Sequence, residues 1–283
     1  MIALISTEFT KAARRTRTLI VALVLVALPI AISVAVRSGT GPGNNRDRAP
    51  DDVLFKLAKQ SGLLVPVGVL SAIGGFLLVV IAGTFAGDSV AGDAAWGNLR
   101  YLLMRPVARG RLLMAKAFVA GVLIWAATIF VALVGLAAGI AIFGAHPVNV
   151  TLNPGDGAAI ASGFHLSTGA LFARVSLATA YVAFGYTALL ALGIFLSTLT
   201  DAAAGAISAT VGIYILSLIL DGISALGRIR YLFPTHYLNS WTTMFTDNQF
   251  SHDMLAGAVV QIAYLVVFGG AALIWFRRKD IRS

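Results

Sequence analysis

The chain lacks cysteine and is poor in charged residues. Without cysteine it can form no disulfide bond, no thiolate metal site and no cysteine nucleophile. Charged residues make up only 12% of its 283 residues, whereas soluble domains usually carry about 25%. Apolar residues account for 58%. This composition excludes an ordinary soluble protein.

The chain also lacks a polar stretch long enough to fold as a separate soluble domain. Its longest segment between apolar runs has 33 residues, and domains commonly need about 50 or more. No Gly-x-x-x-x-Gly-Lys-Ser/Thr phosphate loop occurs in the sequence, so we expect no ATP site of that kind in this chain. A separate nucleotidase, receptor or DNA-binding module is therefore excluded, and we expect no nucleic-acid partner.

What the chain does contain is six uncharged apolar runs of 18 to 27 residues. A helix crosses a hydrocarbon core of about 30 Å in roughly 20 residues and satisfies every backbone hydrogen bond internally. We therefore predict an all-α integral membrane fold in which residues 1–283 form one transmembrane domain. The six predicted spans are residues 19–36, 63–86, 117–143, 175–200, 202–220 and 254–276.

Basic residues indicate the orientation of the spans. If the N-terminus is cytoplasmic, 13 of the 21 lysines and arginines fall in the 56 cytoplasmic residues, and 8 fall in the 90 residues on the opposite side. Positive charge is retained on the cytoplasmic side, so we predict that both termini are cytoplasmic. The net charge of +9 then reflects orientation and contact with anionic head groups, and membrane lipid is an expected partner.

Three further patterns lie in or beside the spans. Residues 3–17 place apolar side chains on one helical face, which predicts a helix lying in the head-group plane. Residues 221–253 are too polar to span yet rich in aromatic residues, which predicts an external re-entrant hairpin before the last span. Gly83 and Gly87 stand four residues apart, a spacing that lets helix backbones approach closely within one subunit or in a dimer.

The predicted cytoplasmic stretch between the second and third spans, residues 87–116, has the most specific pattern. We predict a short helix over 96–104 with Leu99 and Leu103 on its apolar stripe, and we expect Asp93 to cap its N-terminus or to complement the charge there. The proline that follows ends this helix, because the residue before a proline resists helix. A short amphipathic helix held at the membrane surface is suited to fit a groove on a partner protein.

This stretch resembles the permease subunits of ABC-2 type ATP-binding-cassette exporters. That family has an acidic residue a few positions before Gly-Thr-Leu, then paired leucines, Pro-Val with a nearby basic residue, and a lysine at the start of the next span. The corresponding elements here are Asp93, Gly97-Asn98-Leu99, Leu102-Leu103, Pro106-Val107, Arg109 and Lys116. The sequence departs from the family in having Asp where Glu is usual and Asn where Thr is usual. Weaker similarity extends over nearly the whole chain.

The resemblance implies the permease subunit of an ATP-driven exporter with an ABC-2, or type V exporter, fold in a bacterial inner membrane. Such a chain is not itself an enzyme and binds no cofactor. Two copies of a separate ATPase subunit would bind ATP and Mg²⁺, and a second permease subunit would complete a homodimer or heterodimer. The cargo would be amphipathic, lipid-like or drug-like. The implied docking residues for the ATPase are Asp93, Gly97, Leu99, Leu103, Arg105, Pro106 and Arg109.

Polar residues within the spans could line a substrate path or could only form interhelical hydrogen bonds, which average about 0.6 kcal/mol each. The candidates for residues that line a substrate path are Tyr181, Tyr186, Tyr214 and Gln261. The histidines and carboxylates lack the spacing of a zinc or calcium site, so no metal site is predicted.

Two other functions stay open from the sequence. An ion-coupled carrier usually needs ionisable groups inside the bilayer, where each costs about 2.5–3.5 kcal/mol at a helix centre. All 21 basic and 12 acidic residues lie outside the predicted spans, which weakens this alternative. The other alternative is a non-transporting membrane assembly or sensor subunit. Co-purification of an ATPase and the response of ATP hydrolysis to cargo distinguish these functions.

Overall fold

A computed structural model describes residues 2–39, 55, 58–97, 108–150, 164–246 and 251–278. Most of these residues are helical. In chain order the elements are α1 (Ile2–Ala13), α2 (Thr16–Ser38), η1 (Gly62–Leu64), α4 (Val65–Gly74), α5 (Leu77–Ala95), α7 (Arg109–Phe143), β1 (Val148–Val150), β2 (Phe164–Leu166), α8 (Thr168–Gly185), α9 (Thr187–Leu199), α10 (Ala203–Asp221), η2 (Ser224–Leu232), η3 (Ser240–Thr242), α11 (Thr243–Thr246) and α12 (His252–Arg278).

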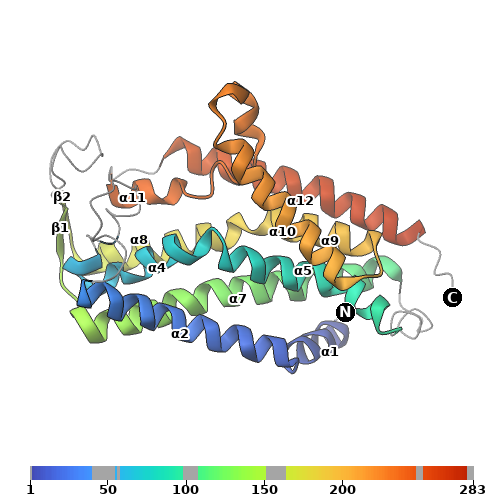
Figure 1. Cartoon of the computed structure of the whole chain (residues 1–283), viewed down its shortest axis with the longest axis horizontal. Coiled ribbons are helices and arrows are strands. Elements are labelled where there is room, and N and C mark those ends of the chain that lie inside the picture. The colour runs from blue at the N-terminus through green and yellow to red at the C-terminus, as the bar shows by residue number, and fades with distance from the viewer. Residues whose placement is uncertain are drawn as a thin grey trace.

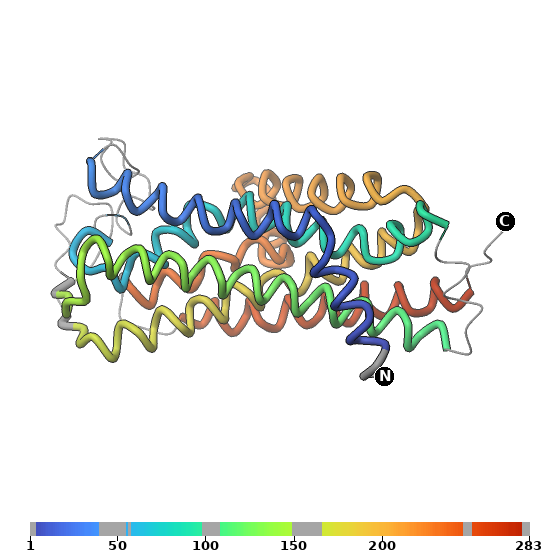
Figure 2. Tube along the Cα trace, turned by 90° about the horizontal axis from the view of Figure 1, so that it is seen from below, coloured from blue at the N-terminus to red at the C-terminus, as the bar shows by residue number. Residues whose placement is uncertain are grey.

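The long helices form a bundle that runs along the longest dimension of the molecule (Figures 1 and 2). Within the described residues, six segments are long and apolar enough to cross a membrane: α2, α5, α7, α8 with α9, α10 and α12. Both chain ends lie toward one end of the bundle, and the short antiparallel pair β1 and β2 lies at the other (Figure 1). The prediction of a helical membrane fold with six spans is confirmed.

The N-terminal segment forms two helices. α1 ends at Ala13, and α2 begins at Thr16, three residues before the predicted span. α2 ends at Ser38, where Gly39 takes a left-handed φ of 76° that glycine adopts most readily. Figure 2 shows α1 turning away from the axis of α2. This is the arrangement expected of a surface helix that precedes a span.

Two helices extend well beyond the predicted spans. α5 continues to Ala95, nine residues past the predicted end of the second span, and α7 begins at Arg109, eight residues before the predicted start of the third. The connection between these helices is therefore much shorter than residues 87–116. Trp96 and Gly97 form a turn, so the helix predicted over 96–104 does not begin at its first two positions, and the remainder falls outside the described residues.

Two predicted spans are broken, which the apolar pattern did not indicate. The run 63–86 is interrupted after Gly74, and the run 175–200 is interrupted at Tyr186. A break leaves backbone groups that hydrocarbon cannot satisfy, so the protein must satisfy them internally. The hydroxyl of Tyr186 donates a 2.7 Å hydrogen bond to the carbonyl of Gly74. One side chain thus connects the two breaks.

Gln261 of α12 satisfies further backbone groups near these breaks. Its side-chain oxygen accepts a 3.0 Å hydrogen bond from the backbone nitrogen of Ala188, which lies in the first turn of α9. Its amide nitrogen donates to the carbonyl of Pro234 at 3.2 Å. The hydroxyl of Tyr181 similarly donates to the carbonyl of Tyr237 at 2.9 Å. These bonds attach α8, α9 and α12 to the segment before α12.

The two glycines of α5 that stand four residues apart pack against another helix of the same chain. Gly83 and Gly87 face α10, where a Cβ atom added at Gly87 would lie 2.9 Å from the backbone of Ile207. That distance is shorter than van der Waals contact, so only glycine fits without moving a helix. The four-residue spacing therefore permits a close α5–α10 contact inside one subunit.

The segment that directly follows α10 projects from the side of the bundle, where it is the topmost part of Figure 1, whereas α11 lies against the bundle. We call Ser224–Leu232 the arm, and none of its residues is buried. Two contacts join its flanks at a neck. Ser217 and Thr235 share a 2.8 Å hydrogen bond, and Asp221 lies 2.6 Å from Nδ1 of His236. This is the hairpin predicted before the last span.

Candidate functional site

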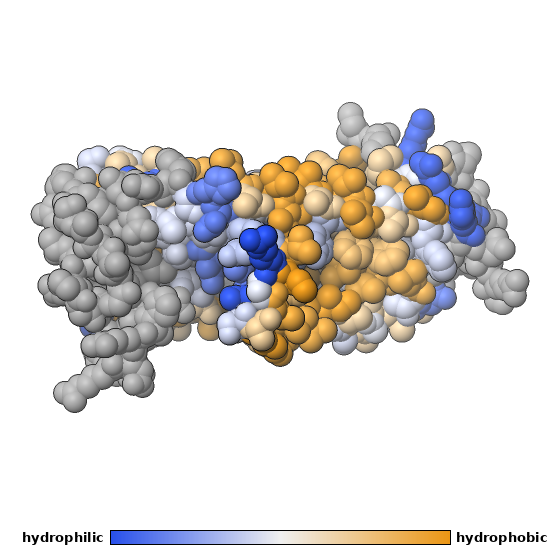
Figure 3. Space-filling view, turned by 90° about the horizontal axis from the view of Figure 1, so that it is seen from above, coloured by the Kyte–Doolittle hydropathy of each residue, from blue (hydrophilic) through white to orange (hydrophobic). Residues whose placement is uncertain are grey.

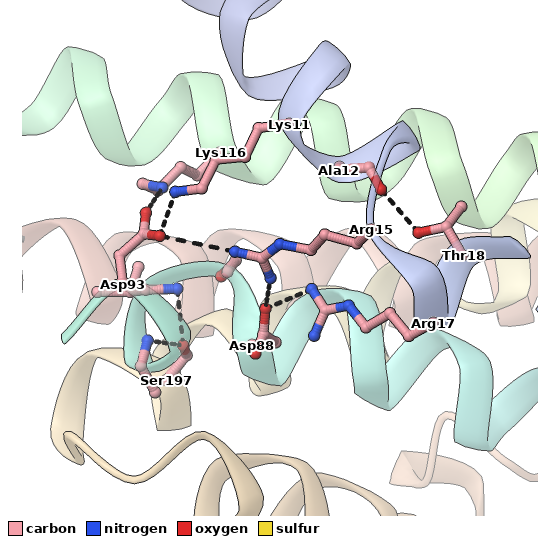
Figure 4. A network of polar contacts seen from close by, with 12 residues as sticks. Lys11, Ala12, Arg15, Arg17, Thr18, Asp88, Asp93, Lys116 and Ser197 are labelled. Atoms are coloured by element: carbon pink, nitrogen blue, oxygen red, sulfur yellow. Dashed lines mark hydrogen bonds and ion pairs between the residues drawn. The ribbon is translucent and has the colours of Figure 1, made fainter. Parts of the chain in front are cut away.

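The segment predicted to couple to a partner is bounded by the end of α5 and the start of α7. Residues 98–107 between these helices fall outside the described residues. The predicted docking residues Leu99, Leu103, Arg105 and Pro106 are among them. The candidate site therefore consists of the two flanking helix ends and of α1, which lies against them (Figure 4).

Asp93 and Lys116 form a buried ion pair between α5 and α7, and each side chain is 2% exposed. Burying two charges is costly unless they are paired and make further hydrogen bonds. Lys116 also donates to Glu8 of α1, with 2.9 Å between Nζ and Oε2. Asp93 accepts a further bond from Lys11 of α1. The pair thereby joins three helices.

A second carboxylate on α5 extends this contact along the helix. Asp88 pairs with Arg15 and Arg17, which lie at the junction of α1 and α2. Arg15 also approaches Asp93, with 3.7 Å between Nη2 and Oδ1. The junction therefore bridges both aspartates, as the dashed lines of Figure 4 show.

α9 is attached to the same stretch of α5 by Ser197. Its buried hydroxyl accepts hydrogen bonds from the backbone nitrogens of Val90 at 3.0 Å and Ala91 at 2.8 Å. One turn earlier, a Cβ atom added at Gly193 would lie 2.6 Å from Cβ of Ala86. Two small residues four positions apart thus let α9 approach α5 closely.

The cluster joins α1, α5 and α7, and the space among its side chains is small. It contains the carboxylates of Glu8, Asp88 and Asp93 and the basic groups of Lys11, Arg15, Arg17 and Lys116. The cavity among these side chains is about 40 Å³, enough for water alone. Within the described ranges, no group of three metal-ligating side chains occurs. Moving one of the three helices must therefore move the others or separate buried charges.

The structure places three of the predicted docking residues. Asp93 lies in the last turn of α5 and is buried, and its carboxylate pairs with Lys116 and Lys11. Most of the helix that Asp93 was expected to cap or charge-complement falls outside the described residues. Gly97 follows α5 with a φ of 67°, a conformation that favours glycine. Arg109 begins α7, and its guanidinium lies 3.5 Å from the carbonyl of Arg277 in α12.

Sequence reasoning missed the partners that α1 and the start of α2 supply to this cluster. The ion pairs join positions 71 to 108 residues apart, and no local pattern encodes such distances. One signal was available. Asp88 and Asp93 stand among small and apolar residues, and Lys116 is followed by a long apolar run. Charges in such surroundings are seldom buried unless they are paired.

The four predicted path residues have different surroundings. As described above, Tyr181, Tyr186 and Gln261 are hydrogen bonded to backbone groups beside helix breaks and loops. Tyr214 differs, because its buried hydroxyl has no hydrogen-bond partner among the described residues. Part of Tyr214 also borders a cavity of about 210 Å³ between α9, α10 and α12.

A protein family described as ABC-2 family transporter protein matches residues 2–281. The chain belongs to this family. The match includes α1, both flanks of the predicted coupling segment and α12, and it agrees with six apolar helices. The ABC-2 chain is therefore a multi-pass membrane permease, the membrane component of an ABC transporter. A search of curated proteins finds no significant match.

Proposed function

We propose that this ABC-2 chain is the permease subunit of an exporter driven by a separate ATPase. Two ATPase copies bind ATP and Mg²⁺ and dock on the segment between α5 and α7. A second permease subunit completes the translocation path. Both termini lie on the cytoplasmic side of a bacterial inner membrane, and the cargo is amphipathic, lipid-like or drug-like.

The buried Asp93–Lys116 pair is the observation that carries this proposal. It joins the two helices that flank the docking segment, and α1 closes over it through Glu8 and Lys11. A displacement imposed on this segment by an ATPase therefore reaches α1, α5 and α7 together. Because α5 also packs against α9 and α10, the displacement extends to further spans.

The placement of charge argues against an ion-coupled carrier. In the described part of the chain, the buried charged residues are Asp88, Asp93 and Lys116. All three are paired within the cluster at one end of the bundle. A proton-coupled carrier would be expected to hold a carboxylate deeper in the bundle, and the described residues offer no buried carboxylate there.

Docking is tested by Leu99→Asp, which places a charge on the predicted apolar stripe. Tagged wild-type and variant chains are expressed at equal levels in native host cells and purified in mild detergent. Co-purifying proteins that contain a phosphate-loop motif are then quantified by mass spectrometry. We expect L99D to lose at least about 90% of the ATPase, because a charge in an apolar interface costs more than the 1.4 kcal/mol that a tenfold loss requires.

The matched control is Leu199→Asp, which makes the same change at the end of α9, where Leu199 is 42% exposed. This position lies outside the docking segment, so L199D should retain the ATPase. Equal recovery of the ATPase with L99D and wild type would contradict the docking assignment. An ATPase that co-purifies but whose hydrolysis no cargo alters would favour the assembly or sensor alternative.

The cargo class is tested in vesicles that contain the permease with its ATPase. ATP should drive accumulation of an amphipathic fluorescent compound, because the exposed faces of the spans are apolar. Vesicles that pump only small hydrophilic solutes would contradict this part of the proposal.

A further inference from the structure

A cavity of about 210 Å³ lies between α9, α10, α12 and the neck of the arm. Leu192 belongs to its α9 wall, Leu216 and Leu220 to its α10 wall, and Phe268 to its α12 wall. Phe233 borders it at the neck. The cavity shares no lining residue with the ion-pair cluster. It is therefore a separate feature of the molecule.

The chemistry of the lining favours an apolar occupant, because most of its residues are apolar and its polar side chains are those of Tyr214, Ser217 and Tyr264. None of the described residues that line the cavity is charged. Ser217 is already hydrogen bonded to Thr235, and the hydroxyl of Tyr214 is itself buried. Water needs about 2–4 polar partners to occupy a buried site, and an empty cavity forfeits dispersion contacts. An apolar group is the occupant that suits these walls.

The cavity adjoins the surface that faces the bilayer. Ile213 and Leu216 line it and are 42% and 53% exposed. Ile219 of α10 and Val266 of α12 are 59% and 66% exposed, although neither lines the cavity. Figure 3 looks onto the side from which the arm rises and shows hydrophobic surface beside a hydrophilic group. In a multi-pass membrane protein, such apolar surface faces hydrocarbon wherever no second subunit covers it.

The size of the cavity suits a short length of hydrocarbon chain. An engineered apolar cavity of about 150 Å³ stays dry and binds benzene, so 210 Å³ corresponds to about eight carbon atoms. The end of a phospholipid acyl chain supplies such a length. Acyl chains are also the most abundant apolar groups against this surface.

We infer that this cavity binds the end of one acyl chain of a membrane phospholipid. The chain enters beside α10 and packs against Phe233 and Pro234, so it supports the neck from which the arm rises. Binding needs only this protein and a bilayer. The inference therefore does not rest on ATPase docking or on the identity of the cargo.

The test uses the full-length protein, without an ATPase, in phospholipid nanodiscs. The probe is a phosphatidylglycerol with a diazirine near the end of one acyl chain, and mass spectrometry locates the labelled residues after irradiation. Labelling of cavity residues should exceed labelling of Val266, which represents bulk lipid contact. Leu220→Trp should lower cavity labelling at least about fivefold, because the indole occupies the volume that the chain needs.

Ile219→Trp is the matched control, because it makes a similar change one residue away and outside the cavity. Cavity labelling in I219W should equal that in the wild type. Should L220W fail to fold, Leu192→Phe fills the same cavity from α9. Undiminished labelling in the cavity-filling variant would overturn the inference. Labelling of the cavity residues that does not exceed labelling of Val266 would also overturn it. Cross-links between two copies of the chain that show α10 covered by a second subunit would do the same.

Discussion

Among the substitutions considered, we expect removal of the buried charge of Asp93 to cause the largest loss of folding stability. Asp93→Asn removes one of the two carboxylates that pair with Lys116, and the side chains of Asp93 and Lys116 are each 2% exposed. Breaking one side of a buried pair costs about 3–5 kcal/mol when the remaining charge has no other partner, and Glu8, which still pairs with Lys116, lowers that cost here. We expect a clear fall in the midpoint of thermal unfolding of the purified protein in detergent.

The control for this variant is Asp201→Asn, which alters an exposed carboxylate in the turn between α9 and α10. Exposed substitutions usually change stability by no more than about 0.5 kcal/mol. Equal unfolding midpoints for D93N and D201N would show that the Asp93–Lys116 pair does not hold α5 and α7 together.

Tyr186 is a predicted path residue, and a substitution there can distinguish a role in folding stability from a role in transport. Tyr186→Phe keeps the ring but leaves the carbonyl of Gly74 without its donor, at a cost of about 1–3 kcal/mol. Tyr231→Phe removes an exposed hydroxyl from the arm and should be nearly neutral. Thermal unfolding of both variants measures the difference. Unchanged stability in Y186F together with altered transport would instead support a place for Tyr186 in the path.

At the scale of elements, the spans could be predicted because an uncharged apolar run is a direct consequence of the hydrocarbon thickness. The breaks at Gly74 and Tyr186 could not be predicted in this way. The run that contains Tyr186 has no proline, and the partners that satisfy the exposed backbone come from other helices. Helix extensions were missed for a related reason, since Asp93 and Lys116 are charged and yet buried.

The contact between α5 and α10 gives a prediction at this scale. Gly87→Ala places a Cβ atom 2.9 Å from the backbone of Ile207, so the two helices must separate. Overpacking of this kind costs about 1–3 kcal/mol. Gly212→Ala is the control, because nothing lies within 4 Å of its added Cβ atom and alanine favours helix. Thermal unfolding should show G87A destabilised and G212A unchanged or slightly stabilised, and the reverse order would contradict the packing.

At the scale of the whole molecule, the sequence located the candidate site but not its composition. The spacing around Gly97 and Arg109 predicted a docking segment between two spans, but α5 and α7 extend nine and eight residues further into that segment than predicted. The contacts of α1 and of its junction with α2 depend on Lys11 and Arg15 meeting carboxylates that lie more than 70 residues away. Only the folded arrangement of α1, α5 and α7 brings these groups together, and the docking positions between Gly97 and Arg109 remain predictions.

The orientation of the whole molecule can be tested because the chain contains no cysteine. Single cysteines are introduced in place of Ser6 in α1 and Ser224 in the arm, which are both exposed. The larger share of basic residues predicts that Ser6 lies in the cytoplasm. α10 would then carry Ser224 to the opposite side.

Intact cells should therefore label S224C with a membrane-impermeant maleimide and leave S6C unlabelled until the membrane is permeabilised. The cysteine-free wild type gives the background. Labelling of S6C in intact cells would show that the orientation is opposite to the predicted one. The Asp93–Lys116 cluster would then lie on the side that a cytoplasmic ATPase cannot reach. The proposed coupling would then fail even if the packing of α1, α5 and α7 were correct, because an ATPase can move only helices on its own side of the membrane.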